Sequence, residues 1–116
     1  MEKVTIIIND PPYGTEKAWN AFRYAQALNS IHAEIHIFLL ADAVLCAKQG
    51  QSNPPGYYNL EGMLKELIER GAKVKACGTC MRSRGIKSEE LLEGVEVGKM
   101  LDLASWTRES QKVITF

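Results

Sequence analysis

The sequence has no excess of charge of either sign. Its 116 residues include 14 lysines and arginines and 14 aspartates and glutamates, so the formal net charge is zero. A protein that holds nucleic acid or an anionic membrane by electrostatics normally carries a surplus of basic residues, and this composition provides none. We therefore expect no direct nucleic-acid partner and no membrane partner.

Long hydrophobic runs are also missing. The longest, residues 35–44, is interrupted by His36 and Asp42, whereas a membrane-spanning helix needs about 20 predominantly apolar residues. The N-terminus leads directly into a strand pattern without the features of a secretory signal. These observations predict a cytoplasmic protein, and a chain of this length is typical of a single domain, residues 1–116.

Cysteine is scarce, and several catalytic motifs do not occur. Three cysteines, Cys46, Cys77 and Cys80, are an odd number in a chain of ordinary apolar content, which is untypical of a secreted disulfide framework. We expect free thiols in a reducing compartment. The sequence has no glycine-rich phosphate loop, no Ser/His/Asp order and no paired catalytic carboxylates. A cofactor is therefore not expected.

What the chain does contain is an alternation of strand and helix patterns. Residues 4–8, Val-Thr-Ile-Ile-Ile, are typical of a strand buried on both faces of a parallel sheet. We expect further strands at 33–40, 72–76, 95–97 and 112–116. We expect helices at 16–29, 42–48, 60–70 with Asn59 as its cap, a short one from 88, and 99–108.

This alternation predicts an α/β fold: a three-layer, doubly wound and mainly parallel sheet of about five strands, of flavodoxin or Rossmann type. Residues 4–8 are expected in the centre of the sheet, because their run is the most continuously apolar. The strand that contains Val74 is expected to be one of their neighbours.

The sharpest chemical signal is the motif Cys77-Gly78-Thr79-Cys80, which follows the third expected strand. Reactive groups gather at the carboxyl ends of parallel strands, so the motif lies where such sheets place their chemistry. It fits half of a zinc site, a redox dithiol, a thiolate that carries sulfur, or two buried cysteines that act as small hydrophobes. The sequence has no second cysteine pair and no histidine at ligand spacing from the motif. This disfavours a zinc site, so no metal is expected. The pattern favours sulfur transfer and leaves a CxxC redox protein as an alternative.

Two arginines follow the motif closely. Cations near a cysteine stabilise its reactive thiolate form. We therefore predict Cys77 and Cys80 as the catalytic residues, with Arg82 and Arg84 supporting the thiolate. A helical turn that begins near Thr79 would also direct backbone N–H groups at the sulfur.

Four segments together resemble the DsrE/TusD (DsrE/DsrF-like) family of small sulfur-relay proteins. They are Asp-Pro-Pro-Tyr-Gly-Thr at 10–15, Ala-Phe-Arg-Tyr-Ala-Gln-Ala-Leu at 21–28, Val-Lys-Ala-Cys at 74–77 and Arg-Gly-Ile at 84–86. The resemblance spans nearly the whole chain and implies a DsrE-like α/β domain. In that family the cysteine that ends the third strand carries sulfur as a persulfide, and by position that residue is Cys77.

The resemblance also implies a role and partners. The chain is expected to be an intracellular, sulfurtransferase-like persulfide carrier that takes sulfur from a donor and passes it to an acceptor thiol. Donor and acceptor are expected to be proteins or small sulfane-sulfur compounds. Many members of the family have a second cysteine where Cys80 stands, and it could act as a resolving thiol or as a second carrier. Members form trimers or hexamers, so a homotrimer or homohexamer is expected.

The aromatic residues also predict association between subunits. Trp19, Tyr57, Tyr58 and Trp106 are more aromatic surface than a small domain readily buries, which indicates a subunit interface. The rival interpretation is a non-catalytic oligomer that keeps the fold and binds a small ligand in the cleft between its subunits, with unreactive cysteines. Cys46 is expected in the core.

Overall fold

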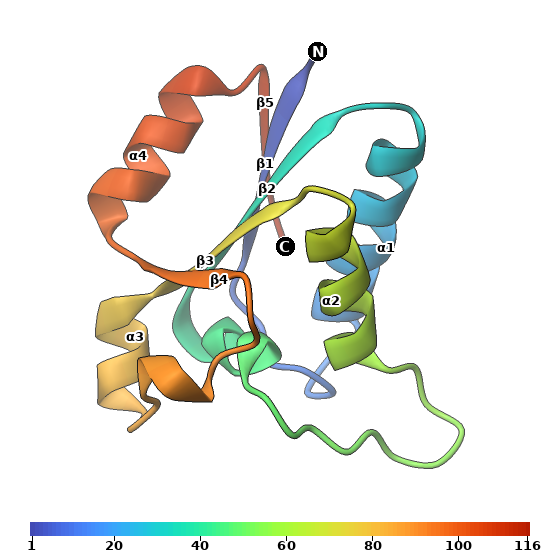
Figure 1. The fold of residues 1–116 in the computed structure, drawn as a ribbon, viewed down its shortest axis with the longest axis vertical. Coiled ribbons are helices and arrows are strands. Elements are labelled where there is room, and N and C mark those ends of the chain that lie inside the picture. Colours follow the sequence, from blue (N-terminus) through green and yellow to red (C-terminus); the bar gives the residue numbers. More distant parts are fainter.

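Five strands form one fully parallel sheet in the order β4-β3-β2-β1-β5 (Figure 1). The computed structural model describes residues 1–116. The strands are β1 (Lys3–Ile8), β2 (Glu34–Leu39), β3 (Lys73–Cys77), β4 (Val95–Gly98) and β5 (Lys112–Thr115). The predicted doubly wound α/β architecture is therefore confirmed.

Helices cover both faces of this sheet and give three layers (Figure 1). Helices α1 (Lys17–Ser30) and α2 (Leu60–Glu69) lie on one face, and α4 (Met100–Glu109) lies on the other. The short helix α3 (Gly78–Ser83) follows β3 directly. Two 3-10 helices lie in connections between strands: η1 (Ala41–Ala47) follows β2, and η2 (Ser88–Glu90) precedes β4. None of these helices combines the length and apolar character needed to cross a membrane.

Strand β1 is internal and not at an exposed edge, but the middle strand of the sheet is β2, and the one neighbour predicted for β1, the strand with Val74, is wrong. Val4, Ile6 and Ile8 are fully buried, and β1 pairs with β2 on one side and β5 on the other. Val74 instead pairs with Ile37 of β2. The crossovers through α1 and α2 lie on the same face, so right-handed connections add β2 and then β3 outward from β1. After β4 the chain returns across the sheet and adds β5 on the other side of β1.

Some of the aromatic side chains that were expected at the surface are buried inside the domain. Trp106 of α4 is only 7% exposed, and its ring meets Phe38 edge-on at a centroid distance of 6.0 Å. Trp106 is thus a core residue, because α4 needs a large apolar side chain to fill the space above β2. Trp19 stacks on Tyr58 at 4.3 Å within the same chain, whereas Tyr57 is 58% exposed.

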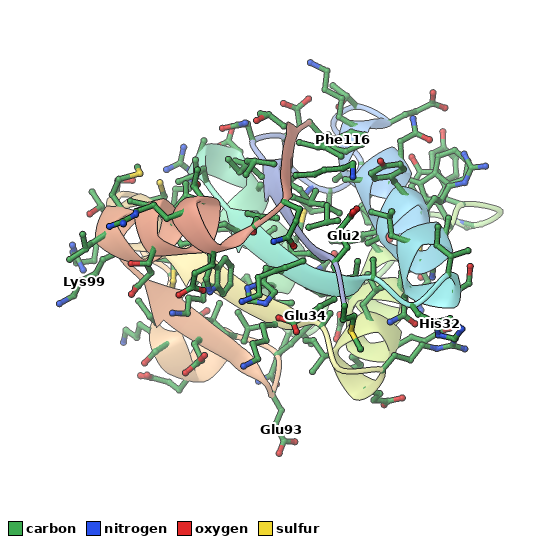
Figure 2. All side chains as sticks on the ribbon, turned by 90° about the horizontal axis from the view of Figure 1, so that it is seen from above. Glu2, His32, Glu34, Glu93, Lys99 and Phe116 are labelled. Atoms are coloured by element: carbon green, nitrogen blue, oxygen red, sulfur yellow. The ribbon has the colours of Figure 1, made fainter.

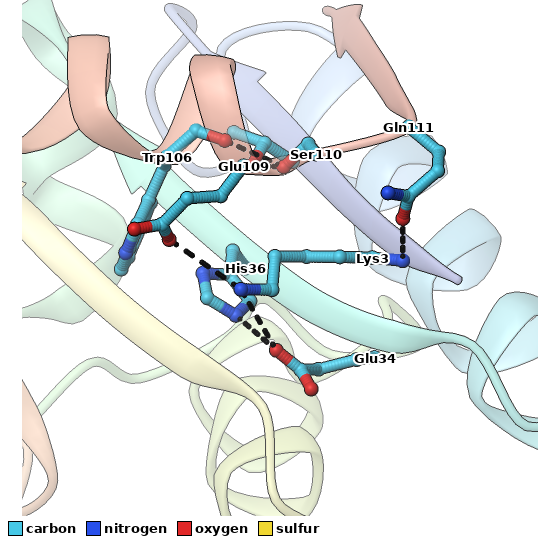
Figure 3. Close-up of polar contacts among 8 residues, drawn as sticks. Lys3, Glu34, His36, Trp106, Glu109, Ser110 and Gln111 are labelled. Carbon is cyan, nitrogen blue, oxygen red and sulfur yellow. Dashed lines mark hydrogen bonds and ion pairs between the residues drawn. The ribbon is translucent and has the colours of Figure 1, made fainter. Parts of the chain in front are cut away.

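A buried histidine lies beneath α4 (Figure 3). His36 is 3% exposed, its Nε2 is 2.8 Å from Glu34 Oε2, and its Nδ1 has no hydrogen-bond partner. The Trp106 ring lies edge-on to the imidazole at 4.6 Å. Burial lowers the pKa of His36, and the hydrogen bond to Glu34 opposes this only in part, while Lys3 and Lys73 add to the lowering. The fold therefore favours the neutral imidazole.

This burial predicts a loss of stability in mild acid. Because the pKa of His36 is lower in the fold, the unfolded chain takes up a proton first as the pH falls below about 6.5, and the free energy of unfolding decreases. Urea unfolding between about pH 7 and about pH 5 should show this slope, and His36→Gln should flatten it. The control is His32→Asn, which removes the exposed histidine at positive φ and should keep the wild-type slope. Equal slopes in wild type and His36→Gln would contradict the assignment.

Candidate functional site

The two cysteines of the motif lie at the direct junction between β3 and α3. Cys77 is the last residue of β3 and also the N-cap of α3, so no loop separates the strand from the helix. The backbone N–H of Cys80 donates a hydrogen bond to Cys77 Sγ at 3.3 Å. The sulfur thus takes the place of the serine or aspartate oxygen that usually accepts this bond. Cys77 is 6% exposed and Cys80 is half-buried.

Glycines make this junction sterically feasible. A Cβ atom at position 78 would lie 2.9 Å from Val97 Cγ1 of β4, closer than such atoms approach one another. Gly78 therefore allows α3 to begin directly against the neighbouring strand. Gly85 follows the helix with φ +68°, a conformation that favours glycine, and turns the chain back toward the sheet.

The second thiol has its own hydrogen-bond donor, which the sequence analysis did not identify. The backbone N–H of Ala41, just after β2, donates to Cys80 Sγ at 3.2 Å. Ala41 has φ +52°, in the left-handed region that non-glycine residues seldom adopt. The only signal available in the sequence was the position of residues 40–41 at the carboxyl end of a strand.

The two arginines occupy different places. Arg84 Nε lies 2.8 Å from Asp42 Oδ1, and Arg84 Nη1 donates to the Cys80 carbonyl at 3.1 Å. Arg84 therefore ties α3 to η1. Arg82 Nη2 donates to Thr79 Oγ1 at 3.3 Å and forms no ion pair. Neither guanidinium forms a hydrogen bond with Cys77 Sγ.

The surroundings raise the pKa of both Cys80 and Cys46. Burial raises the pKa of Cys80, as does its hydrogen bond with the Cys77 side chain, while the Ala41 N–H and the charge of Arg84 oppose the rise. Cys46 is fully buried, burial raises its pKa to about 12, and its Sγ lies 3.8 Å from the Asp10 carbonyl oxygen. Cys46 is thus a core residue, as expected, and does not belong to the thiol pair.

A cavity of about 510 Å³ opens beside the pair. Leu40, Val97 and Met100 form its apolar wall, and Arg82 and Lys99 add two cations that form no ion pair. Lys99 lies at the start of α4, at the opposite end of the molecule from His32 (Figure 2). The cavity brings sulfur nucleophiles, cations and apolar surface together in one place.

Other residues considered from the sequence lie elsewhere. The loop after β1 shares the carboxyl edge of the sheet with the thiol pair but lines a separate cavity, of about 440 Å³, through Tyr13 and Thr15. His36 is buried under α4, and His32 is exposed in a turn. No group of three or more histidine, cysteine, aspartate or glutamate side chains has the geometry to hold a metal ion.

Comparison with known proteins places this geometry in a family. The model of the DsrE/DsrF-like family matches residues 2–116. Protein YchN of Escherichia coli K12 is 40% identical over 118 residues, covering all of both chains, and the crystal structure of E. coli YchN matches this fold with a TM-score of 0.94.

Two more distant proteins are also similar to this chain. Sulfurtransferase TusD of Buchnera aphidicola is 29% identical over 97 residues, which cover 82% of this chain and 76% of TusD. A protein of unknown function from Methanobacterium thermoautotrophicum has the same fold, with a TM-score of 0.74 at 16% identity over 98% of this chain and 99% of its own. The resemblance inferred from the sequence motifs is confirmed, and this chain belongs to the DsrE/DsrF-like family.

Proposed function

We propose that this protein is a sulfur carrier that holds sulfane sulfur as a persulfide on Cys77 and passes it to an acceptor thiol. The observation that supports this most is the Cys77 sulfur itself, which ends β3, accepts the Cys80 N–H and lines the cavity. The Cys80 N–H holds this sulfur in place beside the cavity, where the donor would bind. The similarity to a protein named sulfurtransferase supports the same chemistry.

The proposed reaction is two successive exchanges at sulfur. The Cys77 thiolate attacks the terminal sulfane sulfur of the donor, a new S–S bond forms, and the donor's S–S bond breaks to release its remainder as an anion. An acceptor thiolate then attacks the outer sulfur and leaves Cys77 as a thiolate. Each step conserves electrons, so the transfer needs no cofactor.

The cations suit an anionic donor. Arg82 and Lys99 lie on the cavity without carboxylate partners, so both charges are available to a ligand. Polysulfide and thiosulfate are small sulfane-sulfur anions of this kind, and a donor protein would present a persulfide that is also anionic. We propose that these cations draw the donor to Cys77, while the charge of Arg84 favours the thiolate of Cys80. A reducing compartment such as the cytoplasm would keep both thiols available.

An apolar patch adjoins the cavity and suits a second copy of the chain. Val97, Met100 and Leu101 are 46%, 62% and 74% exposed. A soluble protein seldom leaves such side chains clustered in water. We propose that subunits of a homotrimer or homohexamer bury this patch and so help enclose the thiol cavity, which leaves donor and acceptor to approach from the open side.

The first test identifies the cysteine that carries sulfur. Incubation with polysulfide under nitrogen should add about 32 Da, one sulfur atom, to Cys80→Ser, as measured by intact-mass spectrometry, and Cys46→Ser should behave as wild type. Cys77→Ser should gain nothing. Loading of Cys77→Ser but not of Cys80→Ser would move the carrier to Cys80. No loading of any variant would favour the small-ligand-binding oligomer.

A second test concerns the cation on the cavity. Arg82→Ala should slow alkylation of Cys77 by iodoacetate several-fold near neutral pH, because the guanidinium on the cavity attracts the anionic reagent. Peptide mapping identifies the modified cysteine. The matched control is Arg108→Ala, which removes an exposed arginine near the end of α4 and should leave the rate unchanged. An equal effect of both variants would point to net charge rather than to the site.

A third test concerns assembly. Light scattering should give a mass of about three or six times the 12.9 kDa of one chain. The double variant Met100→Asp, Leu101→Asp should reduce that mass, because it places charges in the buried patch. Ile31→Asp, at another strongly exposed apolar residue, is the control and should remain oligomeric. A monomeric wild type at micromolar concentration would refute the proposal.

A further inference from the structure

The proposed function uses one thiol, yet the structure equips two. Cys80 lines the same cavity as Cys77, and its sulfur accepts the Ala41 N–H at 3.2 Å. No disulfide joins the cysteines in the structure. A cysteine that served only to fill space would need no such donor, because a neutral thiol is a weak acceptor.

The donor to Cys80 is held in place by the rest of the site. Ala41 adopts its strained backbone conformation at the start of η1, and the next residue, Asp42, binds Arg84. Arg84 in turn donates to the Cys80 carbonyl. This closed set of contacts fixes the loop after β2 against α3, so the Ala41 N–H points at the Cys80 sulfur and not at solvent.

The spacing of the two cysteines suits a bond between their sulfurs. Residues three apart on a helix share a face, and Cys-X-X-Cys at the start of a helix is the spacing that disulfide oxidoreductases use. The Cys80 backbone N–H donates to Cys77 Sγ at 3.3 Å, so the first turn of α3 lies against that sulfur. When Cys77 carries a persulfide, its inner sulfur is therefore the electrophile nearest to Cys80.

We propose that Cys80 is a resolving thiol, which expels the carried sulfur as hydrogen sulfide and closes a Cys77–Cys80 disulfide. The Cys80 thiolate attacks Cys77 Sγ of the persulfide, the Cys77–sulfur bond to the outer atom breaks, and HS⁻ leaves and takes the proton that Cys80 gave up. The outer sulfur is reduced to sulfide and the two cysteines are oxidised. One such event needs no added reductant, whereas a further round needs a dithiol reductant. The inference rests on the proposed function because it starts from the Cys77 persulfide.

The contacts also order the two steps. Burial raises the pKa of Cys80 most, and the neighbouring Cys77 side chain adds to the rise, which favours the protonated Cys80 thiol before loading. Conversion of Cys77 Sγ into the inner atom of a persulfide removes the charge from that atom. The Ala41 N–H and the charge of Arg84 favour the Cys80 thiolate, so they support its attack on the inner sulfur.

The test follows sulfur and disulfide together under nitrogen. Reduced protein is loaded with polysulfide and desalted, and released sulfide and non-reduced intact mass are then measured. Wild type and Cys46→Ser should release close to one equivalent of sulfide per chain and become about 2 Da lighter than the reduced protein, by loss of two hydrogens. Cys80→Ser and Cys80→Ala should stay about 32 Da heavier and release almost none. Circular dichroism checks that both variants fold.

The possible outcomes separate the two proposals. Wild type that keeps the added sulfur as long as Cys80→Ser does would overturn the resolving role and leave the carrier function in place. Added sulfur that peptide mapping finds on Cys80 of wild type would also overturn it, because the attack would then have occurred at the outer sulfur. Failure of Cys80→Ser to load at all would instead contradict the carrier function. Asp42→Asn, which weakens the hold on Arg84, should still load sulfur but release sulfide several-fold more slowly.

Discussion

The candidate site depends on the absence of a loop between β3 and α3. Cys77 completes the strand and caps the helix, so sheet hydrogen bonds fix its backbone on one side and the Cys80 N–H holds its sulfur on the other. A longer connection would separate the sulfur from the helix and let it move. Gly78 is the residue that permits the short connection, since any side chain there would collide with β4.

The parallel sheet supplies the rest of the site by register. Strand β2 pairs with β3, so Leu39 lies beside Ala76 and the residues that follow β2 reach the thiol pair. Strand β4 pairs on the other side, which brings Gly98 beside Cys77 and places the start of α4 along the cavity. Three strand ends therefore contribute to one cavity, as the carboxyl edges of parallel sheets commonly do.

Features that depend on a few neighbouring residues could be predicted from the sequence, whereas features that depend on the order of the strands could not. The buried run at 4–8 and the Asn59 cap, which accepts the Gly62 N–H at 3.0 Å, act over a few residues and are visible in the sequence. The Ala41 donor and the burial of Trp106 depend on which strands are neighbours, and the misplaced Val74 shows that strand order was the missing information. A backbone N–H also has no side-chain signature, so no motif could have identified it.

The bond between the Cys80 amide and the Cys77 sulfur gives the site a spectroscopic readout of its own. The resonance of an amide proton depends on the electron density of the atom that accepts it. Two-dimensional NMR of the ¹⁵N-labelled protein therefore offers one signal, from Cys80, that reports the chemical state of Cys77, and a second, from Ala41, that reports the state of Cys80. Because each sulfur has its own amide, the two thiols can be followed separately and in real time without any label on sulfur.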